Sequence, residues 1–126
     1  MSYEIAELNT KDLGGVFDLT IESGLNAGQS KQDWIKTQLW LLGDSKVNTG
    51  IAAPLGHVMY KAGKLIGFVG YSQRLFKCDG EISPAIVLNE LVVHPEHRGI
   101  AGIMLCKHTL RYFENDFENW KILGLH

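Results

Sequence analysis

Residues 89–103 combine the groups from which a protein builds a binding site for an anion. A β-prone run ends at Val93, a short turn with Pro95 follows, and Arg98 and Gly99 lead into a helical pattern. The first amides of a helix have no partner within it, and the helix dipole adds partial positive charge there. Arg98 would add a fixed charge suited to phosphate oxygens. The segment therefore predicts either a phosphate site or a plain turn whose glycine only permits tight packing.

The composition places this segment in one ordinary globular domain. The chain has 126 residues, of which 45% are apolar and 21% charged, so we expect a single domain over residues 1–126. Lys and Arg number 12 against 14 Asp and Glu, a net charge of −2, which argues against a strongly basic nucleic-acid binder. No apolar run reaches the roughly 20 residues of a membrane helix, and no secretory signal opens the sequence. We expect a cytoplasmic location and neither a nucleic acid nor a membrane as partner.

The cysteines and the histidines of the turn do not predict a disulfide or a metal site. Cys78 and Cys106 lie far apart in the sequence, and free thiols in a reducing compartment fit them better than a bridge. His94 and His97 form an H-x-x-H pattern in a turn, with no third ligand evident. Because a metal site needs about three or four ligands of fixed geometry, we expect no metal here.

The N-terminal half predicts a strand and two helices. Residues 3–8 alternate as in a strand, and an apolar helical face follows over 13–21. A second helix is predicted over 34–42, ended by Gly43. The stretch 43–54 is rich in turn-forming residues and is predicted to be a loop.

The C-terminal half predicts a hairpin, a central strand, a long helix and a last strand. Residues 57–61 and 64–71 flank a glycine-containing turn, as in a β-hairpin. The run 85–93 is almost continuously apolar, which predicts burial on both faces in the middle of a sheet. A helix and a short strand then complete a β-α-β unit with parallel strands. The predicted order is β-α-α-β-β-β-α-β, and the fold class is α+β with a mixed α/β sheet.

The long helix carries apolar residues at spacings of three and four, which predict its buried face. These residues are Ile103, Cys106, Leu110, Phe113 and Phe117. Cys106 is therefore expected in the core. We expect His57 and His108 to be ordinary strand and helix-surface residues.

The string 91–99, Leu-Val-Val-His-Pro-Glu-His-Arg-Gly, resembles the acetyl-CoA motif of the GCN5-related N-acetyltransferases, the GNAT superfamily. In that family the strand ends in V-x-P-x-x-R-G, and a glycine-rich loop then opens a long helix. The hairpin over 60–69 is similar to the family's second and third strands, and the strand over 3–8 with its two helices matches in order and spacing. The resemblance covers essentially the whole chain and implies a GNAT-like mixed central sheet.

The loop departs from the family pattern R/Q-x-x-G-x-G/A in either register. Counted from Arg98, Ala101 stands where the first glycine belongs and Ile103 where Gly or Ala belongs. Counted from Glu96, Gly99 and Ala101 fit, but a glutamate replaces Arg or Gln. The departures bear on how tightly a coenzyme would bind more than on the fold.

The end of the sequence also departs from the family pattern. The family continues into another helix and two more strands, and often takes a tyrosine general acid from that region, whereas this sequence stops at His126. We expect a GNAT-like domain that lacks the usual C-terminal helix and last two strands. Either the domain is truncated, or a second chain completes the sheet edge in a homodimer.

The resemblance implies a coenzyme site along the motif. Backbone groups of Leu91, Val92 and Val93 would bind the pantetheine arm. The pyrophosphate would be bound by loop amides, those of Arg98, Gly99, Ile100, Ala101, Gly102 and Ile103. The thioester would lie near Asn89, Glu90 and residues 123–125, and the acceptor amine would enter from the side of the first two helices.

The chemistry of such a site needs a positioned amine, a polarised thioester carbonyl and a base. Glu90 is the only carboxylate of the motif strand, so it is the candidate base, acting directly or through water. The other interpretation is that Glu90 only hydrogen-bonds or faces solvent at a strand end. Asn89 is the second candidate, as a group that orients water or substrate.

The leading functional hypothesis is an N-acetyltransferase that transfers an acetyl group from acetyl-CoA to a primary amine of a small molecule or protein. The alternative is a catalytically inactive GNAT-fold module that binds a partner, and a third is an incomplete family member without independent function. Coenzyme binding separates the first hypothesis from the other two. The sequence carries no signature for the acceptor.

Overall fold

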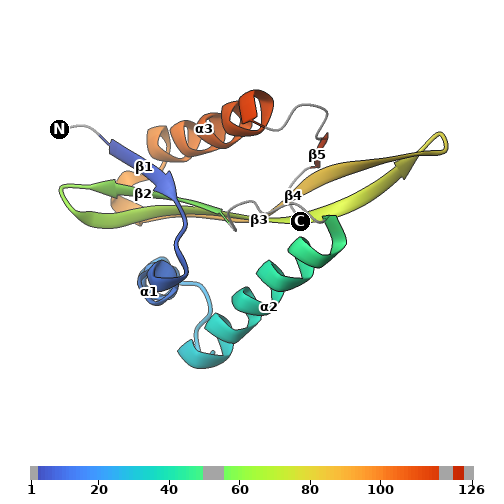
Figure 1. The fold of residues 1–126 in the computed structure, drawn as a ribbon. Coiled ribbons are helices and arrows are strands. Elements are labelled where there is room, and N and C mark those ends of the chain that lie inside the picture. The colour runs from blue at the N-terminus through green and yellow to red at the C-terminus, as the bar shows by residue number, and fades with distance from the viewer. Residues whose placement is uncertain (1–2, 50–55, 117–120, 124–126) are drawn as a thin grey trace.

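A computed structural model describes residues 3–49, 56–116 and 121–123 (Figure 1). The elements are β1 (Tyr3–Glu7), the 3-10 turn η1 (Thr10–Asp12), α1 (Leu13–Glu22), α2 (Lys31–Thr49), β2 (Gly56–Lys61), β3 (Lys64–Cys78), β4 (Glu81–Val93), the 3-10 turn η2 (Pro95–His97), α3 (Ile100–Asp116) and β5 (Lys121–Leu123). Apart from the two 3-10 turns, this is the predicted order.

The strands form one sheet in the order β1-β2-β3-β4-β5. Neighbours are antiparallel except for β4 and β5, which are parallel. Helix α3 covers one face of the sheet, and α1 and α2 cover the other (Figure 1). The predicted α+β class with a mixed sheet is therefore confirmed. Within the described ranges, no helix is both long enough and apolar enough to cross a membrane.

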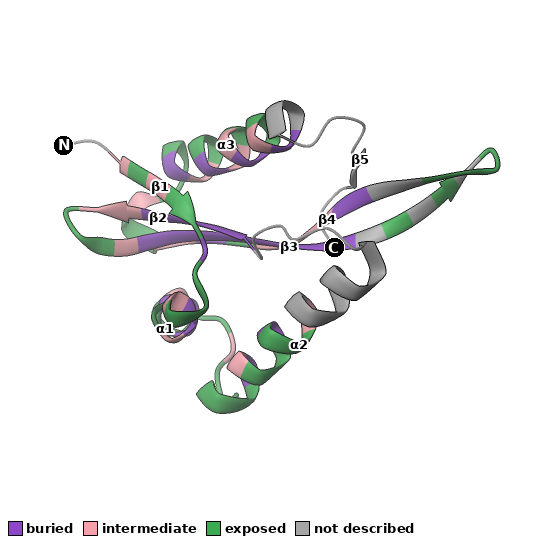
Figure 2. Cartoon of the chain, viewed as in Figure 1, coloured by how far each residue is buried: buried purple, intermediate pink, exposed green. Residues whose placement is uncertain are grey.

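The core lies in two layers, one on each face of the sheet (Figure 2). The layer under α1 and α2 contains Leu8, Leu13, Val16, Phe17, Leu19, Trp34, Val58, Phe68 and Val92. The layer under α3 contains Met59, Ile66, Val69, Ala101 and Leu105. Strand residues alternate between the two layers, as the pleat of a strand requires. The two layers hold the C-terminal half of β4 between the helices.

Helix α2 is longer than predicted. Gly43 does not end it, and the helix continues to Thr49, so the prediction of a loop from residue 43 was wrong. An internal glycine costs a helix only about 1 kcal/mol, and contacts between α2 and β3 offset that cost. The rest of the predicted loop, residues 50–55, lies outside the described residues.

The hairpin of β3 and β4 also extends beyond the prediction. We expected a turn over 78–81 and a strand from residue 85, but the strands pair up to Cys78 and Glu81. Only Asp79 and Gly80 form the turn, with φ of 51° and 83°. Positive φ at both central residues matches the twist of a tight hairpin, so pairing continues to the turn itself. The side chain of Cys78 lies outside the described part.

Helix α3 presents a different face to the sheet from the one predicted. Its buried residues recur every fourth position, and they are Ala101, Leu105, Thr109 and Phe113. Of the predicted apolar stripe, Phe113 is buried as expected, whereas Ile103 is 60% exposed and Leu110 is 38% exposed. The prediction was therefore wrong for these two residues, and Phe117 lies outside the described residues. Small residues allow the close approach: a Cβ built on Gly67 would lie 3.4 Å from Leu105 Cδ2.

Gly56, at the start of β2, is predicted to be the glycine least tolerant of a side chain. A Cβ added there would lie 2.2 Å from the backbone oxygen of Val69. Because backbone must move to relieve that overlap, Gly56→Ala should lower the free energy of unfolding by more than about 2 kcal/mol. Gly15→Ala is the control: a Cβ at this helical position meets nothing within 4 Å. It should leave stability unchanged or raise it by up to about 1 kcal/mol. Equal urea midpoints for the two variants would contradict the prediction.

Candidate active site

Among the described residues, the strands β4 and β5 pair over a short stretch. Their pairing joins Ala85–Val87 to Lys121–Leu123. In the described part of the chain, no strand flanks Leu88–Val93 on the β5 side. Leu123 is the last described residue of β5, and 124 and 125 are outside the described residues. Within the described part, the C-terminal half of β4 thus has an open edge. Leu91 is 37% exposed, contrary to the predicted burial on both faces.

A β-bulge shapes β4 at the same point. Leu88 pairs with Tyr71 and Glu90 pairs with Gly70, so Asn89 is the extra residue of the bulge. Beyond it, the His94 amide donates to the Ile66 carbonyl at 2.8 Å.

Pairs in an antiparallel ladder alternate between those that exchange hydrogen bonds and those that do not. His94 bonds to Ile66 on β3, so the backbone groups of Val92, two residues earlier, also face β3. Those of Leu91 and Val93 face the open edge. Among the three predicted pantetheine residues, Leu91 and Val93 therefore direct their backbone groups to the open edge, whereas Val92 does not. The Val92 side chain is buried in the core.

The turn after β4 leads into the N-terminus of α3. Arg98 is extended and exposed, and Gly99 has a φ of +100°. The Ile103 amide donates to the Gly99 carbonyl at 3.2 Å, which makes this the first turn of the helix. The amides of the three residues between them therefore have no acceptor within the helix. Positive φ is the reason that glycine is required at position 99.

The side chains of this N-terminal turn divide between core and surface. Ala101 is fully buried against the sheet, whereas Ile100 is 70% exposed. Gly102 faces β4, since a Cβ built on it would lie 3.7 Å from Val93 Cγ2. The alanine that departs from the family pattern thus serves the packing of α3.

The two histidines of the turn hold it against α1 and β1. His94 Nδ1 accepts from the Glu96 amide at 3.2 Å, so Nε2 carries a proton, and it lies 3.1 Å from a Glu22 carboxylate oxygen. His97 Nδ1 lies 3.4 Å from the Tyr3 hydroxyl. No cluster of three His, Cys, Asp or Glu side chains suited to a metal occurs among the described residues.

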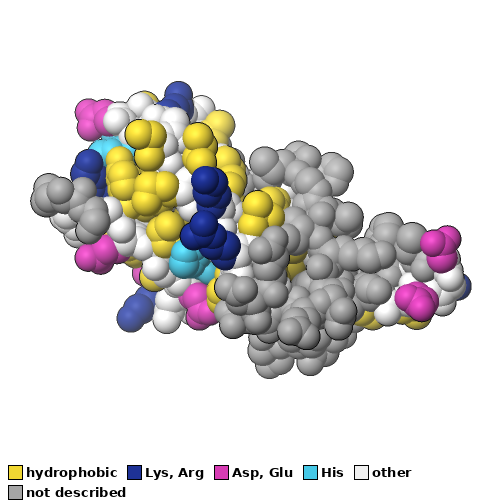
Figure 3. All heavy atoms as spheres, turned by 90° about the horizontal axis from the view of Figure 1, so that it is seen from above, with side chains coloured by type: hydrophobic (Ala, Val, Ile, Leu, Met, Phe, Trp, Pro, Cys, Tyr) yellow, Lys and Arg dark blue, Asp and Glu magenta, His cyan; other side chains and the backbone are white. Residues whose placement is uncertain are grey.

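A shallow apolar groove of about 400 Å³ runs beside the open edge of β4. It is lined by Leu91, Gly99, Gly102, Ile103, Cys106, Lys107 and Leu110. Figure 3, which looks onto the α3 side, shows hydrophobic side chains gathered on this surface next to Lys and Arg side chains. The sequence prediction missed Cys106, Lys107 and Leu110 as lining residues because it assigned the apolar stripe to the core. Cys106 is only half-buried.

Glu90 lies on the other face of the sheet from the groove. Side chains two residues apart on a strand share a face. The Glu90 side chain therefore points to the same face as that of Val92, which packs in the layer under α1 and α2. Its carboxyl is half-buried, and this burial raises its pKa. No hydrogen-bond or ion-pair partner is found for it among the described side chains. The backbone of Asn89 forms the bulge next to it, while the Asn89 side chain lies outside the described part.

Comparison with known proteins identifies the fold. No family model and no curated protein matches the sequence. Among solved structures, the chain is similar to the aminoglycoside N-acetyltransferase AAC(6′)-Iy in complex with CoA, with a TM-score of 0.69, 19% identity, and coverage of 98% of this chain and 76% of that one. A GNAT family acetyltransferase from Staphylococcus aureus gives a TM-score of 0.67, 18% identity, and coverage of 100% and 87%. A ribosomal-protein-alanine N-acetyltransferase from Brucella melitensis gives 0.68, 20%, and coverage of 99% and 79%.

Proposed function

We propose that this chain, which has the fold of the GCN5-related N-acetyltransferases, transfers an acetyl group from acetyl-CoA to a primary amine. The observation that carries the proposal is a continuous binding path: the open edge of β4 leads to the free amides of α3, with an apolar groove beside it. The path offers strand-like hydrogen bonding, apolar contact and an anion site in one line, as a long thioester with a pyrophosphate requires.

Each part of the path fits one part of the coenzyme. The free amides of Ile100, Ala101 and Gly102 suit the pyrophosphate, and the exposed Arg98 guanidinium adds charge beside them. The backbone groups of Leu91 and Val93 suit the amides of the pantetheine arm. Ile103, which departs from the family's loop pattern, lines the apolar groove, where a large aliphatic side chain provides contact area.

Glu90 is the proposed base, reached from the face covered by α1 and α2. The amine nitrogen attacks the thioester carbonyl carbon, a C–N bond forms, and the C–S bond breaks as CoA leaves as a thiolate. Glu90 accepts the proton that the amine loses, and the departing thiolate is protonated in turn. Burial raises the pKa of Glu90, which brings its basicity closer to what an amine proton requires at neutral pH.

The acceptor class is a primary amine, on a small molecule or on a protein. Similar structures include enzymes named for an aminoglycoside and for a ribosomal protein alanine, so the fold serves both kinds of acceptor in other proteins. A catalytically inactive binding module is the competing proposal, and coenzyme binding decides between the two.

Arg98→Ala should weaken acetyl-CoA binding about tenfold, since it removes a charge-assisted contact to phosphate. The measurement is a thermal-shift titration, in which a ligand of the folded state raises stability with its concentration over Kd. Lys77→Ala is the control, because this exposed cation lies near the far end of the β3–β4 hairpin, outside the groove. A wild-type protein that melts cooperatively but shows no shift with acetyl-CoA would overturn the proposed function. An unchanged Kd in Arg98→Ala would overturn only the pyrophosphate assignment.

A further inference from the structure

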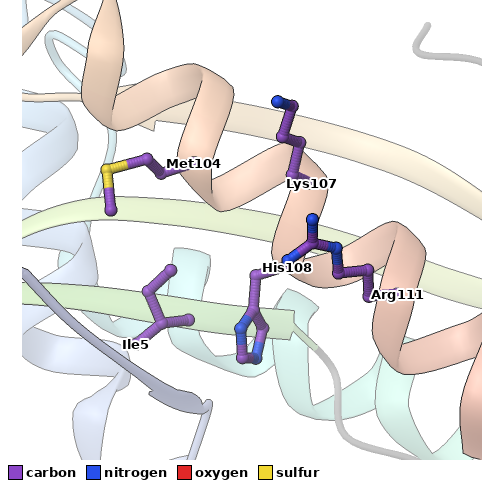
Figure 4. A pocket seen from close by; sticks show the side chains of 5 residues that line it. All are labelled: Ile5, Met104, Lys107, His108 and Arg111. Atoms are coloured by element: carbon purple, nitrogen blue, oxygen red, sulfur yellow. The ribbon is translucent and has the colours of Figure 1, made fainter.

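A second hollow lies on the other flank of α3, between this helix and β1. Its volume is about 260 Å³, and it is lined by Ile5, Met104, Lys107, His108 and Arg111 (Figure 4). Figure 4 shows Met104 and His108 directed from α3 toward the strands, with Ile5 reaching toward them from β1. Only Lys107 also lines the groove beside β4. The hollow is therefore a separate feature from the proposed coenzyme path.

Positive charge dominates the lining of this hollow. Lys107, His108 and Arg111 come from little more than one turn of α3, and none has an ion-pair partner among the described residues. The nearest acidic residue on β1 that shares the face of Ile5 is Glu7, whereas Glu4 points to the opposite face by the alternation of the strand. Glu7 is exposed. Glu7 is therefore the acidic residue of β1 on the side of this cluster, and no ion pair joins it to Lys107, His108 or Arg111 among the described residues.

The wall behind His108 is polar, buried and neutral. His57 is fully buried, its ring centroid lies 4.9 Å from that of His108, and its Nε2 has no hydrogen-bond partner among the described residues. Its Nδ1 lies 3.3 Å from both the Tyr71 and the Thr109 hydroxyl oxygens. Burial lowers the pKa of His57 to about 4, so this residue adds no charge at neutral pH. The fixed positive charges at this hollow are therefore those of Lys107 and Arg111.

We propose that this hollow binds a small phosphate monoester with an apolar body. The guanidinium of Arg111 offers a planar fork of donors that matches phosphate oxygens, and Lys107 and His108 offer further donors. Ile5 and Met104 provide contact for the apolar body of the ligand. The volume is below that of pockets for drug-sized ligands, roughly 300–1,000 Å³, so the ligand is smaller than a nucleotide coenzyme. This site does not depend on the proposed acetyl transfer.

Phenyl phosphate is the probe that tests the site, with phenol as the uncharged control. In an NMR titration of the ¹⁵N-labelled chain, phenyl phosphate should shift the amides of residues 104–111 and of Ile5 in a saturable manner. Phenol should not. Arg111→Gln should weaken the Kd about tenfold, and Glu7→Gln should tighten it. The absence of saturable shifts at these residues up to roughly 10 mM phenyl phosphate would overturn the proposal.

Arg98→Gln separates this site from the coenzyme path. It should leave the Kd for phenyl phosphate at the hollow unchanged, because Arg98 does not line the hollow. If Arg98→Gln and Arg111→Gln weaken the probe equally, or if the shifts cluster at residues 99–102 instead, the probe binds at the N-terminus of α3 and the proposal fails. Both outcomes leave the acetyl-CoA titration as an independent measurement.

Discussion

Replacing Glu90 with glutamine should lower turnover at saturating acetyl-CoA and amine by about 10²- to 10⁴-fold, the usual range for loss of a general base. The amide keeps the size of the side chain and cannot accept the proton. Glu90 lies on the face opposite the coenzyme groove, so the Kd for acetyl-CoA should stay within about twofold of the wild-type value. Steady-state kinetics with a radiolabelled or thiol-detected assay gives the first quantity, and the thermal-shift titration gives the second.

Glu81→Gln is the matched control for this variant. Glu81 lies on the same strand but at its far end, where it is exposed, so its replacement should not change turnover. Because burial raises the pKa of Glu90, the wild-type rate should fall on acidification at a pH above the ordinary carboxyl range. The rate of Glu90→Gln should lack this fall. Equal rates for the two glutamine variants would remove Glu90 as the base.

Acidification from about pH 6.5 to about pH 4 should cost the fold about 3 kcal/mol through His57 alone. In the folded state, burial lowers the pKa of His57 from 6.5 to about 4. The unfolded chain therefore binds a proton through that window that the folded chain does not. Stability is fully present above the unfolded pKa and is lost as the pH falls toward the folded one. Urea unfolding at about pH 7 and about pH 4.5 measures the loss.

His57→Gln should flatten this pH dependence while lowering stability at neutral pH, since the His57 ring fills a buried site between β2 and α3. His97→Gln is the control, because His97 is only half-buried in the turn after β4. It should leave the acid loss in place. If wild type and His57→Gln lose equal stability between the two pH values, the acid sensitivity has another source.

The sequence predicted the elements well wherever the pattern was local. The hairpin at Ala62-Gly63 and the turn from β4 into α3 at Arg98-Gly99 are local patterns, and both elements are where they were predicted. The predictions were wrong where tertiary packing outweighs the local sequence pattern. Gly43 stays helical because α2 packs on β3, and α3 buries Ala101 and Thr109 because small residues permit a close approach to the sheet. Neither fact is visible in the periodicity of apolar residues.

The sequence predicts the motif residues of the candidate site but not the residues that line its groove. A strand–turn–helix motif identifies Glu90 and Arg98 by their position, but it does not say which residues line a groove. The apolar character and regular spacing of Ile103 and Leu110 predict core positions, yet both are exposed and line the groove beside β4. The sequence predicts His57 as an ordinary strand residue. Its burial follows from the pairing of β2 with β1 and β3 and from the packing of α3, and β1 and α3 are both distant from β2 in sequence.

The bulge at Asn89 determines which side chains in the last half of β4 point to each face of the sheet. Before it, Leu88 belongs to the α3 side of the sheet, where it packs with Tyr71 and Ile86. In an unbroken strand Glu90, two residues later, would share that side and point into the core beneath α3. The extra residue reverses the alternation of side chains after it, so Glu90 and Val92 face α1 and α2 instead. A single-residue deletion here would therefore exchange the two faces of the strand's last half without altering the identity of Glu90.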